Sequence, residues 1–329
     1  MVKWGGPRPK GPKVATNKFE SWKEVLEKFL FFKQTCGSAP KTLLDYKKTI
    51  TQFFSRTGAN HNDSNDLKEK ALEYLSAFDN SYTFNLRKTY LKAFFNWLIQ
   101  EEVLETNPLN GVKNRKLEDE IHYLSEDQIR ELLKAPNKRE YSGFRDYVIM
   151  LVMLDCGIRP SEALSILPRH FNPTDCTIYI PASISKTRRD RVVPISTKTS
   201  LELRSLLRVR PSTWGEDKPI FCSWDGKKRL ETSWEHDFKK YTTKAKLSKE
   251  TRSYDLRHTF AIMFLRNGGE LLALKRMLGH TTFAMTERYA RLLAEDIQRE
   301  HKTASPVMKI LADQNRERLT KIKRRNSQS

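Results

Sequence analysis

Two short segments carry arginines placed where a phosphate group could bind. Arg159 lies between the turn residue Gly157 and Pro160, just before a predicted helix start. Arg257 lies near the start of another predicted helix, in the run Tyr254-Asp255-Leu256-Arg257-His258. Backbone amides at a helix N-terminus favour anions, and a guanidinium group binds phosphate oxygens in a fork geometry. Both segments therefore suit chemistry at a phosphate.

A third segment supplies a candidate nucleophile. His280 follows Gly279, and Tyr289 lies nine residues further along the chain. A tyrosine hydroxyl can attack a phosphodiester, but its ordinary pKa of about 10 means that it needs help at neutral pH. A histidine can donate a hydrogen bond to the phosphate or move a proton. Taken singly, each of the three segments fits a salt bridge, a helix cap or a packed side chain better than a catalytic role.

The charge of the chain favours a polyanionic partner. Among 329 residues, 60 are lysine or arginine and 40 are aspartate or glutamate, which gives a net charge of +20. Nucleic acid is the first candidate and an anionic membrane surface the second. No apolar run approaches a membrane span, and the N-terminus lacks the apolar core of a signal peptide. We therefore expect a cytoplasmic, nucleoid-associated protein without a membrane partner.

The cysteine pattern argues against a zinc ribbon or a disulfide framework. Cys36, Cys156, Cys176 and Cys222 form no CxxC pair, and four cysteines are few for a chain of this length. Reduced thiols are the simpler interpretation.

The N-terminal part predicts a helical bundle behind a basic arm. Residues 1–18 combine five basic residues with glycines and prolines, which predicts a flexible arm. Four amphipathic patterns follow, beginning near Ser21 and then covering about 41–56, 66–78 and 84–102. We assign 19–112 to this helical domain and 113–122 to a linker.

The second part predicts a mixed, mostly helical domain over 123–296. Helical patterns fall near 125–134, 144–155, 198–209, 232–246, 255–267, 270–278 and 282–294. Residues 177–180 and 191–195 predict two antiparallel strands joined by a polar hairpin loop. Residues 297–329 predict a C-terminal helix, with an apolar patch at 306–311, and a basic tail. The expected fold class is mainly α, a helical bundle plus a mostly α domain with a small antiparallel sheet.

Together, the three segments resemble the tyrosine recombinases, which include phage and transposon integrases and Xer-type resolvases. The runs Gly-Ile-Arg-Pro-Ser-Glu, Asp-Leu-Arg-His-Thr-Phe-Ala and Leu-Gly-His, with Tyr289 nine residues after the last, stand in the order of that family. The resemblance covers about 120–295 as the catalytic domain. Residues 19–112 resemble the core-binding, DNA-binding domain of the family with less specific motifs.

The resemblance implies a metal-independent site that needs no cofactor. Tyr289 is then the nucleophile that forms a 3′-phosphotyrosyl bond, and Lys186 on the hairpin loop protonates the leaving 5′ oxygen. Attack in cis and donation in trans both stay open, and the short spacing from His280 to Tyr289 favours cis. Two arginines clamp the phosphate and supply the charge that a metal would otherwise carry. The implied catalytic residues are Arg159, Lys186, Tyr254, Arg257, His280 and Tyr289, with Glu162 as an orienting residue.

Tyr254 is a departure from the family pattern. The family usually has a histidine three residues before the second arginine, and this chain has Tyr254 there. Three explanations are open: the site tolerates a hydroxyl donor, His258 partly substitutes, or activity is reduced. We expect tolerance, and we expect His258 to pack or cap rather than to act chemically.

The resemblance also implies partners. These are double-stranded DNA recombination sites and a homotetramer that assembles on DNA from a monomer or weak oligomer. The 306–311 patch would dock on a neighbouring protomer or in cis. Candidate DNA contacts are the basic residues of the bundle and the hairpin loop, Lys41, Lys47, Lys48, Arg87, Lys88, Lys92, Arg188 and Arg189.

The predicted function is site-specific DNA recombination through a Holliday junction, by the integrase or transposase of a mobile element. The alternatives are an Xer-like dimer resolvase, a catalytically impaired relative that only binds DNA, and a type IB topoisomerase. Tyr254 is the feature that favours the impaired relative.

Overall fold

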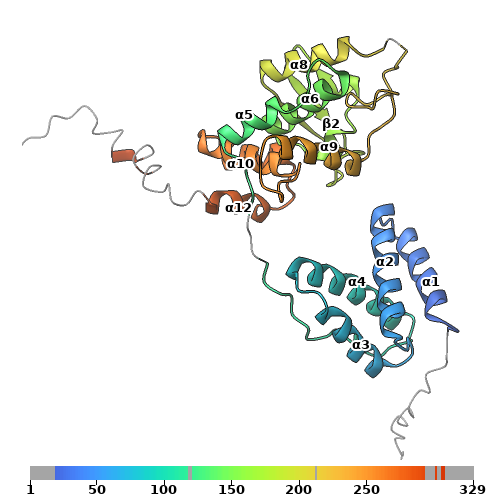
Figure 1. The fold of residues 1–329 in the computed structure, drawn as a ribbon. Coiled ribbons are helices and arrows are strands. Elements are labelled where there is room, and N and C mark those ends of the chain that lie inside the picture. The colour runs from blue at the N-terminus through green and yellow to red at the C-terminus, as the bar shows by residue number, and fades with distance from the viewer. Residues whose placement is uncertain (1–18, 118–120, 212, 293–300, 302–304, 308–329) are drawn as a thin grey trace, which may run out of the picture. The chain divides into compact units, whose positions relative to one another are not determined.

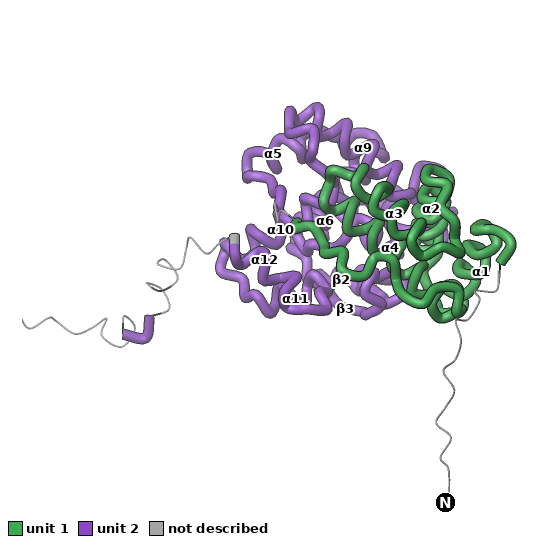
Figure 2. Tube along the Cα trace, turned by 90° about the horizontal axis from the view of Figure 1, so that it is seen from below, with its two compact units in different colours: residues 1–118 green, residues 119–329 purple. Residues whose placement is uncertain are grey.

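The computed structural model describes residues 19–117, 121–211, 213–292, 301 and 305–307. The chain divides into two compact units, residues 1–118 (unit 1) and 119–329 (unit 2), shown in Figure 2. The predicted arm at 1–18, the basic tail and residues 308–311 of the predicted docking patch lie outside the described residues. Helices and one small antiparallel sheet make up the described regular structure (Figure 1), which confirms the predicted fold class.

Unit 1 is built around an aromatic core. Its described helices are α1 (Trp22–Thr35), α2 (Pro40–Thr57), α3 (Ser64–Ser76) and α4 (Ser81–Gln100). Phe29, Phe53, Phe94 and Phe95 are fully buried, and their rings meet edge-on or tilted. Such pairs add to the free energy gained by burying the rings. The core therefore fixes the faces that the four helices present to solvent.

The first half of the predicted linker packs on unit 1. The Asn85 side chain donates to the Arg115 carbonyl and accepts from the Arg115 amide. The Arg115 guanidinium lies over the Phe84 ring, 4.0 Å from its centroid, and donates to the Phe78 carbonyl. Residues up to Arg115 are therefore held against the bundle.

Unit 2 is organised around helix α6 (Tyr141–Cys156), which is buried along most of its length. Helix α6 packs against α8 (Thr197–Arg208) and α10 (Asp255–Arg266). The other described helices are α5 (Glu126–Lys134), α7 (Pro160–Ala163), α9 (Glu231–Lys244), α11 (Leu271–Leu278) and α12 (Ala284–Leu292), with a short 3-10 turn at Pro168–His170. The capping box of Ser125 and Gln128 begins α5, within the predicted helical pattern near 125–134.

The sheet of unit 2 has the strand order β1-β2-β3, and all pairs are antiparallel. Strands β2 (Thr177–Ile180) and β3 (Arg191–Pro194) are the predicted hairpin. Strand β1 (Phe171–Asn172) was not predicted, because its two residues are too few to show an alternation. Arg191 pairs with Ile180 in this register. The hairpin loop therefore begins just after Ile180 and ends just before Arg191, so Arg191 lies at its base.

A bilayer-spanning helix, meaning one long and apolar enough for that role, does not occur in the part of the chain that the structure describes.

Candidate active site

Arg159 is positioned by the end of one helix and the start of the next. Helix α6 stops at Gly157, whose φ of +64° lies in the left-handed region that suits glycine. The chain then turns so that Arg159 becomes the N-cap of α7, with Pro160 at the first helical position. The Arg159 amide and its Nη1 atom both donate to the Glu162 carboxylate, at 2.9 and 3.0 Å.

Glu162 links Arg159 to a second arginine. The carboxylate is fully buried, and Arg191 donates to both of its oxygens, at 3.2 and 2.7 Å. Burial opposes ionisation of Glu162, but hydrogen bonds and charges from Arg191 and Arg159 hold its pKa below the usual value. Arg191 Nε also donates to the Met277 carbonyl at 2.8 Å. Glu162 therefore orients two guanidinium groups, and Arg191 ties strand β3 to helices α7 and α11.

Arg257 is fully buried in the middle of the site. Its Nη1 donates to the Gly157 carbonyl at 2.6 Å, and its Nη2 donates to the Leu278 carbonyl at 2.8 Å. Its Nε atom is buried without a hydrogen-bond partner among the described residues. Burial lowers the pKa of the guanidinium to about 10, so the group stays charged at neutral pH. A buried charge without a counter-ion favours the arrival of an anion.

His280 follows the left-handed turn at Gly279, which ends α11. Arg257 Nη2 lies 3.0 Å from His280 Nε2, and a guanidinium can only donate, so Nε2 accepts. The proton of the neutral ring is then on Nδ1, which donates to Thr286 Oγ1 at 2.9 Å. Burial and the charges of Arg257 and Arg159 lower the pKa of His280 to about 3.

Tyr289 lies on α12 and is only 3% exposed. Its ring stacks on the His280 ring, with centroids 6.4 Å apart and planes at 7°. Its hydroxyl lies 2.8 Å from His258 Nδ1. Burial raises the pKa of Tyr289 to about 12, although the nearby charge of Arg257 opposes the rise. The resting hydroxyl is therefore protonated and needs a base before it can attack.

Tyr254 lies at the edge of this cluster. The side chain is 37% exposed, and its ring meets the His258 ring edge-on at 5.0 Å. The Arg257 guanidinium lies 6.0 Å from the Tyr254 ring centroid. Its hydroxyl forms no hydrogen bond within the described ranges. The hydroxyl is therefore available to a ligand.

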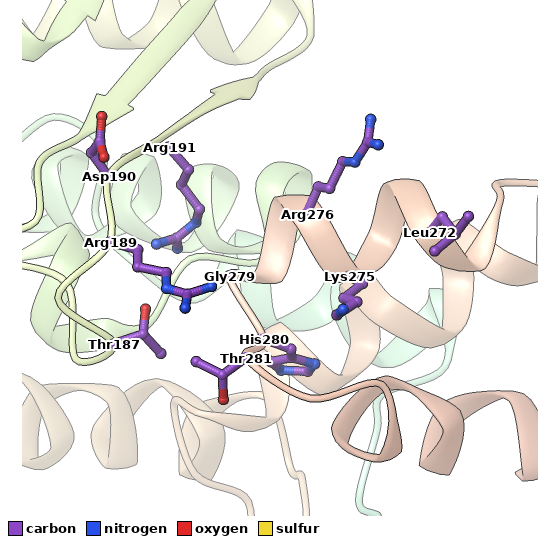
Figure 3. A pocket seen from close by; sticks show the side chains of 10 residues that line it. All are labelled: Thr187, Arg189, Asp190, Arg191, Leu272, Lys275, Arg276, Gly279, His280 and Thr281. Atoms are coloured by element: carbon purple, nitrogen blue, oxygen red, sulfur yellow. The ribbon is translucent and has the colours of Figure 1, made fainter.

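The hairpin loop supplies the remaining predicted residues. Lys186, Arg188 and Arg189 are all exposed between β2 and β3. Lys186 makes no hydrogen bond or ion pair with the residues that the structure describes, so the structure does not bring it into the cluster. Arg189 does reach the cluster, because it lines the same pocket as His280 (Figure 3).

This pocket has a volume of about 400 Å³ and lies between the hairpin loop and α11 (Figure 3). Arg189 and Arg191 extend into it from the hairpin, toward the turn at Gly279 (Figure 3). Lys275 and Arg276 line it from α11. Basic residues on both sides give the pocket a charge that suits a phosphate backbone.

Sequence reasoning missed two residues of the site. His258 was expected to pack or cap, but its Nδ1 atom contacts the Tyr289 hydroxyl. Arg191 was not singled out, although it binds the same carboxylate as Arg159. The position of His258 in the sequence could have identified it. It directly follows Arg257 and lies one helical turn after Tyr254, so it shares a helix face with Tyr254.

In unit 1, the predicted DNA contacts divide into two groups. Lys41, Lys47, Lys48 and Lys92 are exposed. Lys88 is 7% exposed, and its ammonium donates to the Val112 carbonyl at 2.9 Å. Arg87 is half-buried and donates to Thr49. The burial of Lys88 argues against it as a candidate DNA contact, and Arg87 is largely committed to contacts inside the bundle.

Within the ranges that the structure describes, no three His, Cys, Asp or Glu side chains converge as a group that could hold an ion.

Comparison with known proteins gives consistent matches. Residues 122–296 match the profile of the phage integrase family. The chain is 28% identical over 222 residues to tyrosine recombinase XerC of Actinobacillus pleuropneumoniae serotype 7, covering 67% of this chain and 71% of that protein. It is 26% identical over 275 residues to XerC of Escherichia coli O157:H7, covering 82% and 91%.

Solved structures share the fold. A Tn1549 transposon integrase in complex with transposon right end DNA aligns with a TM-score of 0.68 at 19% identity, covering 83% of this chain and 99% of that one. A lambda integrase tetramer bound to a Holliday junction aligns with a TM-score of 0.66 at 17% identity, covering 83% and 82%.

Proposed function

Because this chain belongs to the phage integrase family of tyrosine recombinases, which confirms the resemblance seen in the sequence, we propose that it cleaves and rejoins DNA at specific sites through Tyr289. The observation that carries this proposal is the convergence of Arg257, His280 and Tyr289, which lie on three different helices or turns. Arg159 belongs to the same group, because its charge acts on both His280 and Tyr289. A nucleophile, two guanidinium groups and a histidine are what strand cleavage by a tyrosine requires.

The proposed reaction is a phosphoryl transfer without net hydrolysis. The Tyr289 oxygen attacks the phosphorus, the bond to the 5′ oxygen breaks, and a 3′-phosphotyrosyl bond forms. Arg159 and Arg257 bind the non-bridging oxygens, and Glu162 holds Arg159 in place. His280 can donate to the phosphate only after a proton is placed on Nε2, because at rest Nε2 accepts from Arg257 and the ring proton is on Nδ1. Lys186 protonates the leaving oxygen after the hairpin loop closes on DNA.

The two guanidinium groups would also make the reaction independent of a metal ion. Strand cleavage is therefore expected to proceed unchanged in excess chelator, and no cofactor is proposed.

The proposed partner is double-stranded DNA, bound by exposed lysines of unit 1 and the basic pocket of unit 2. Binding should weaken steeply with salt, because phosphate contacts release counterions. Recombination through a Holliday junction requires four protomers, so we propose a tetramer on DNA. Among the possible roles we favour the integrase or transposase of a mobile element, in line with the transposon integrase among the similar folds. Such a protein would work in the cytoplasm, on the nucleoid.

A specific observation supports each of two other functions. The curated relatives named XerC support an Xer-like resolvase. Tyr254, in the place of the family histidine, supports a catalytically impaired DNA-binding relative. One assay separates the enzymes from the DNA-binding relative, because only an enzyme forms a covalent protein–DNA adduct.

The test uses a nicked half-site taken from the flanks of the gene, which traps the cleaved intermediate. The wild-type chain should give an adduct on a denaturing gel, and Tyr289→Phe should give none while binding the same DNA. Tight, specific binding by the wild type without an adduct would support the DNA-binding relative and contradict the enzyme. Relaxation of supercoiled DNA lacking the site would favour a topoisomerase.

A further inference from the structure

The nucleophile has a base within reach. His258 Nδ1 lies 2.8 Å from the Tyr289 hydroxyl, and it is the hydrogen-bond partner that the described structure gives to that oxygen. The two rings lie 5.7 Å apart and are tilted by 51°. A base must lie within hydrogen-bonding distance of the proton that it removes. His258 meets this condition in the resting chain.

The neighbouring candidates do not meet it. The His280 ring stacks nearly parallel to the Tyr289 ring, and both of its nitrogens are occupied, by Arg257 and Thr286. Tyr254 meets the His258 ring rather than the Tyr289 hydroxyl. A neutral phenol is also a poor proton acceptor at neutral pH. Geometry therefore separates His258 from the other groups around the nucleophile.

We propose that His258 is the general base of strand cleavage, which accepts the Tyr289 hydroxyl proton at Nδ1 as the phenol oxygen attacks phosphorus. The O–H bond of Tyr289 breaks and an oxygen–phosphorus bond forms, while the bond from phosphorus to the 5′ oxygen breaks. The proton remains on His258, and the 5′ oxygen takes a separate proton from Lys186. This inference rests on the proposed function and deepens it, because it gives His258 the role left open by Tyr254.

The surroundings of His258 keep it in the form that can accept a proton. Burial, followed by the charges of Arg257, Arg288 and His122, lowers its pKa to about 4. The ring is therefore neutral at pH 7 and has one free acceptor nitrogen. Its other nitrogen, Nε2, is not among the buried unpartnered atoms and has no hydrogen-bond partner among the described residues. The accepted proton can leave through that nitrogen to water.

Substrate binding would strengthen this base. A phosphodiester held by Arg257 places a negative charge beside the charges that depress proton binding by His258. The proton affinity of His258 then rises when the scissile phosphate is in place. The charges around His258 therefore keep the proton on Tyr289 in the free enzyme, and the bound phosphate activates the nucleophile on DNA.

The test measures single-turnover adduct formation on the nicked half-site. His258→Asn should slow cleavage about 100-fold at neutral pH, the scale of general-base catalysis. The deficit should shrink as the pH is raised, because hydroxide then replaces the missing base. A fluorinated tyrosine in place of Tyr289 has a more acidic hydroxyl, so it should restore much of the lost rate in His258→Asn. The matched control is His236→Asn, the same change at an exposed residue of α9, which should leave the rate unchanged.

Two results would overturn the inference. His258→Asn could cleave at a rate within about twofold of the wild type, far less than the loss of a general base would cause. That result would show that His258 is not the base. The variant could also be slow with no rescue by the fluorinated tyrosine and no pH dependence of the deficit, which would assign His258 a purely structural role. A wild-type chain that binds the site but forms no adduct at any pH would instead contradict the proposed function, and the inference with it.

Discussion

Glu162 and Arg191 are 29 residues apart in the sequence, yet Arg191 donates to both carboxylate oxygens of Glu162. The pair is buried, with side-chain exposures of 0% for Glu162 and 8% for Arg191. The same carboxylate also binds Arg159, so one negative charge pairs with two positive ones and leaves the group with a net positive charge. This arrangement makes Glu162 the residue on which the geometry of the site depends most directly.

The first prediction concerns that carboxylate. Glu162→Ala should lower the free energy of unfolding of unit 2 by on the order of 3–5 kcal/mol, because it leaves two buried guanidinium groups unpaired. Urea-induced unfolding followed by circular dichroism measures the change. Arg130→Ala is the control, since it breaks ion pairs that are more than half exposed and should cost less than about 1 kcal/mol. Equal losses in the two variants would contradict the structural role of Glu162.

The second prediction concerns acid stability. The pKa of His258 is about 4 and that of His280 about 3 in the folded chain, both below the ordinary value of about 6.5. Between the folded and the unfolded pKa values the unfolded chain binds protons that the folded chain does not. Stability from these two groups is therefore complete above about pH 6.5 and falls as the pH drops toward about 3. The thermal midpoint of unit 2 should follow this course in the wild type. In His258→Asn the thermal midpoint should fall less steeply over the same pH window. An unchanged slope would contradict the lowered pKa of His258.

The third prediction concerns Gly157. A Cβ atom there would lie 2.3 Å from Phe260 Cδ1 and 2.8 Å from Leu278 Cδ2, in addition to the strained φ of +64°. Gly157→Ala should therefore cost on the order of 2–5 kcal/mol and displace the carbonyl that holds Arg257. Gly268→Ala is the matched control, because Gly268 also has a positive φ but meets open space, and should cost about 1 kcal/mol. Calorimetry of both variants tests the difference.

The fourth prediction concerns Lys186 as the proposed acid. Lys186→Ala should slow cleavage of ordinary DNA by about 100-fold. A substrate with sulfur in place of the bridging 5′ oxygen should be cleaved at nearly the wild-type rate, because a thiolate leaves without being protonated. Arg159→Ala should stay slow on both substrates, since it loses phosphate binding instead. Slow cleavage of the sulfur substrate by Lys186→Ala would remove Lys186 from the acid role.

Local patterns were sufficient to predict most elements. The capping box at Ser125 and the glycines that end α2, α6 and α11 are short-range signals, and the observed helices begin and end beside them. Lys88 shows the limit of such signals. It lies among basic residues on α4, but the fold turns that position inward against the Val112 carbonyl. Which face of a helix is covered depends on packing, which composition alone does not reveal.

The site was predictable to the extent that its residues follow family motifs. The contacts between those residues were not, because they join distant parts of the chain. His258 and Tyr289 are 31 residues apart and meet only because α10 packs against α12. Arg191 opens a predicted strand in the sequence, but its partners Glu162 and the Met277 carbonyl lie far away along the chain. Long-range packing therefore brings His258 and Arg191 into the site, and the sequence alone did not identify either residue.

The position of Tyr289 has a consequence for the chain while it is being synthesised. Arg159, Arg257 and His280 all precede it, and its helix α12 is the last one described before residue 293. The residues of the phosphate clamp are therefore synthesised before the nucleophile, which follows His280 by only nine residues. The order of translation supplies last the group that breaks a strand.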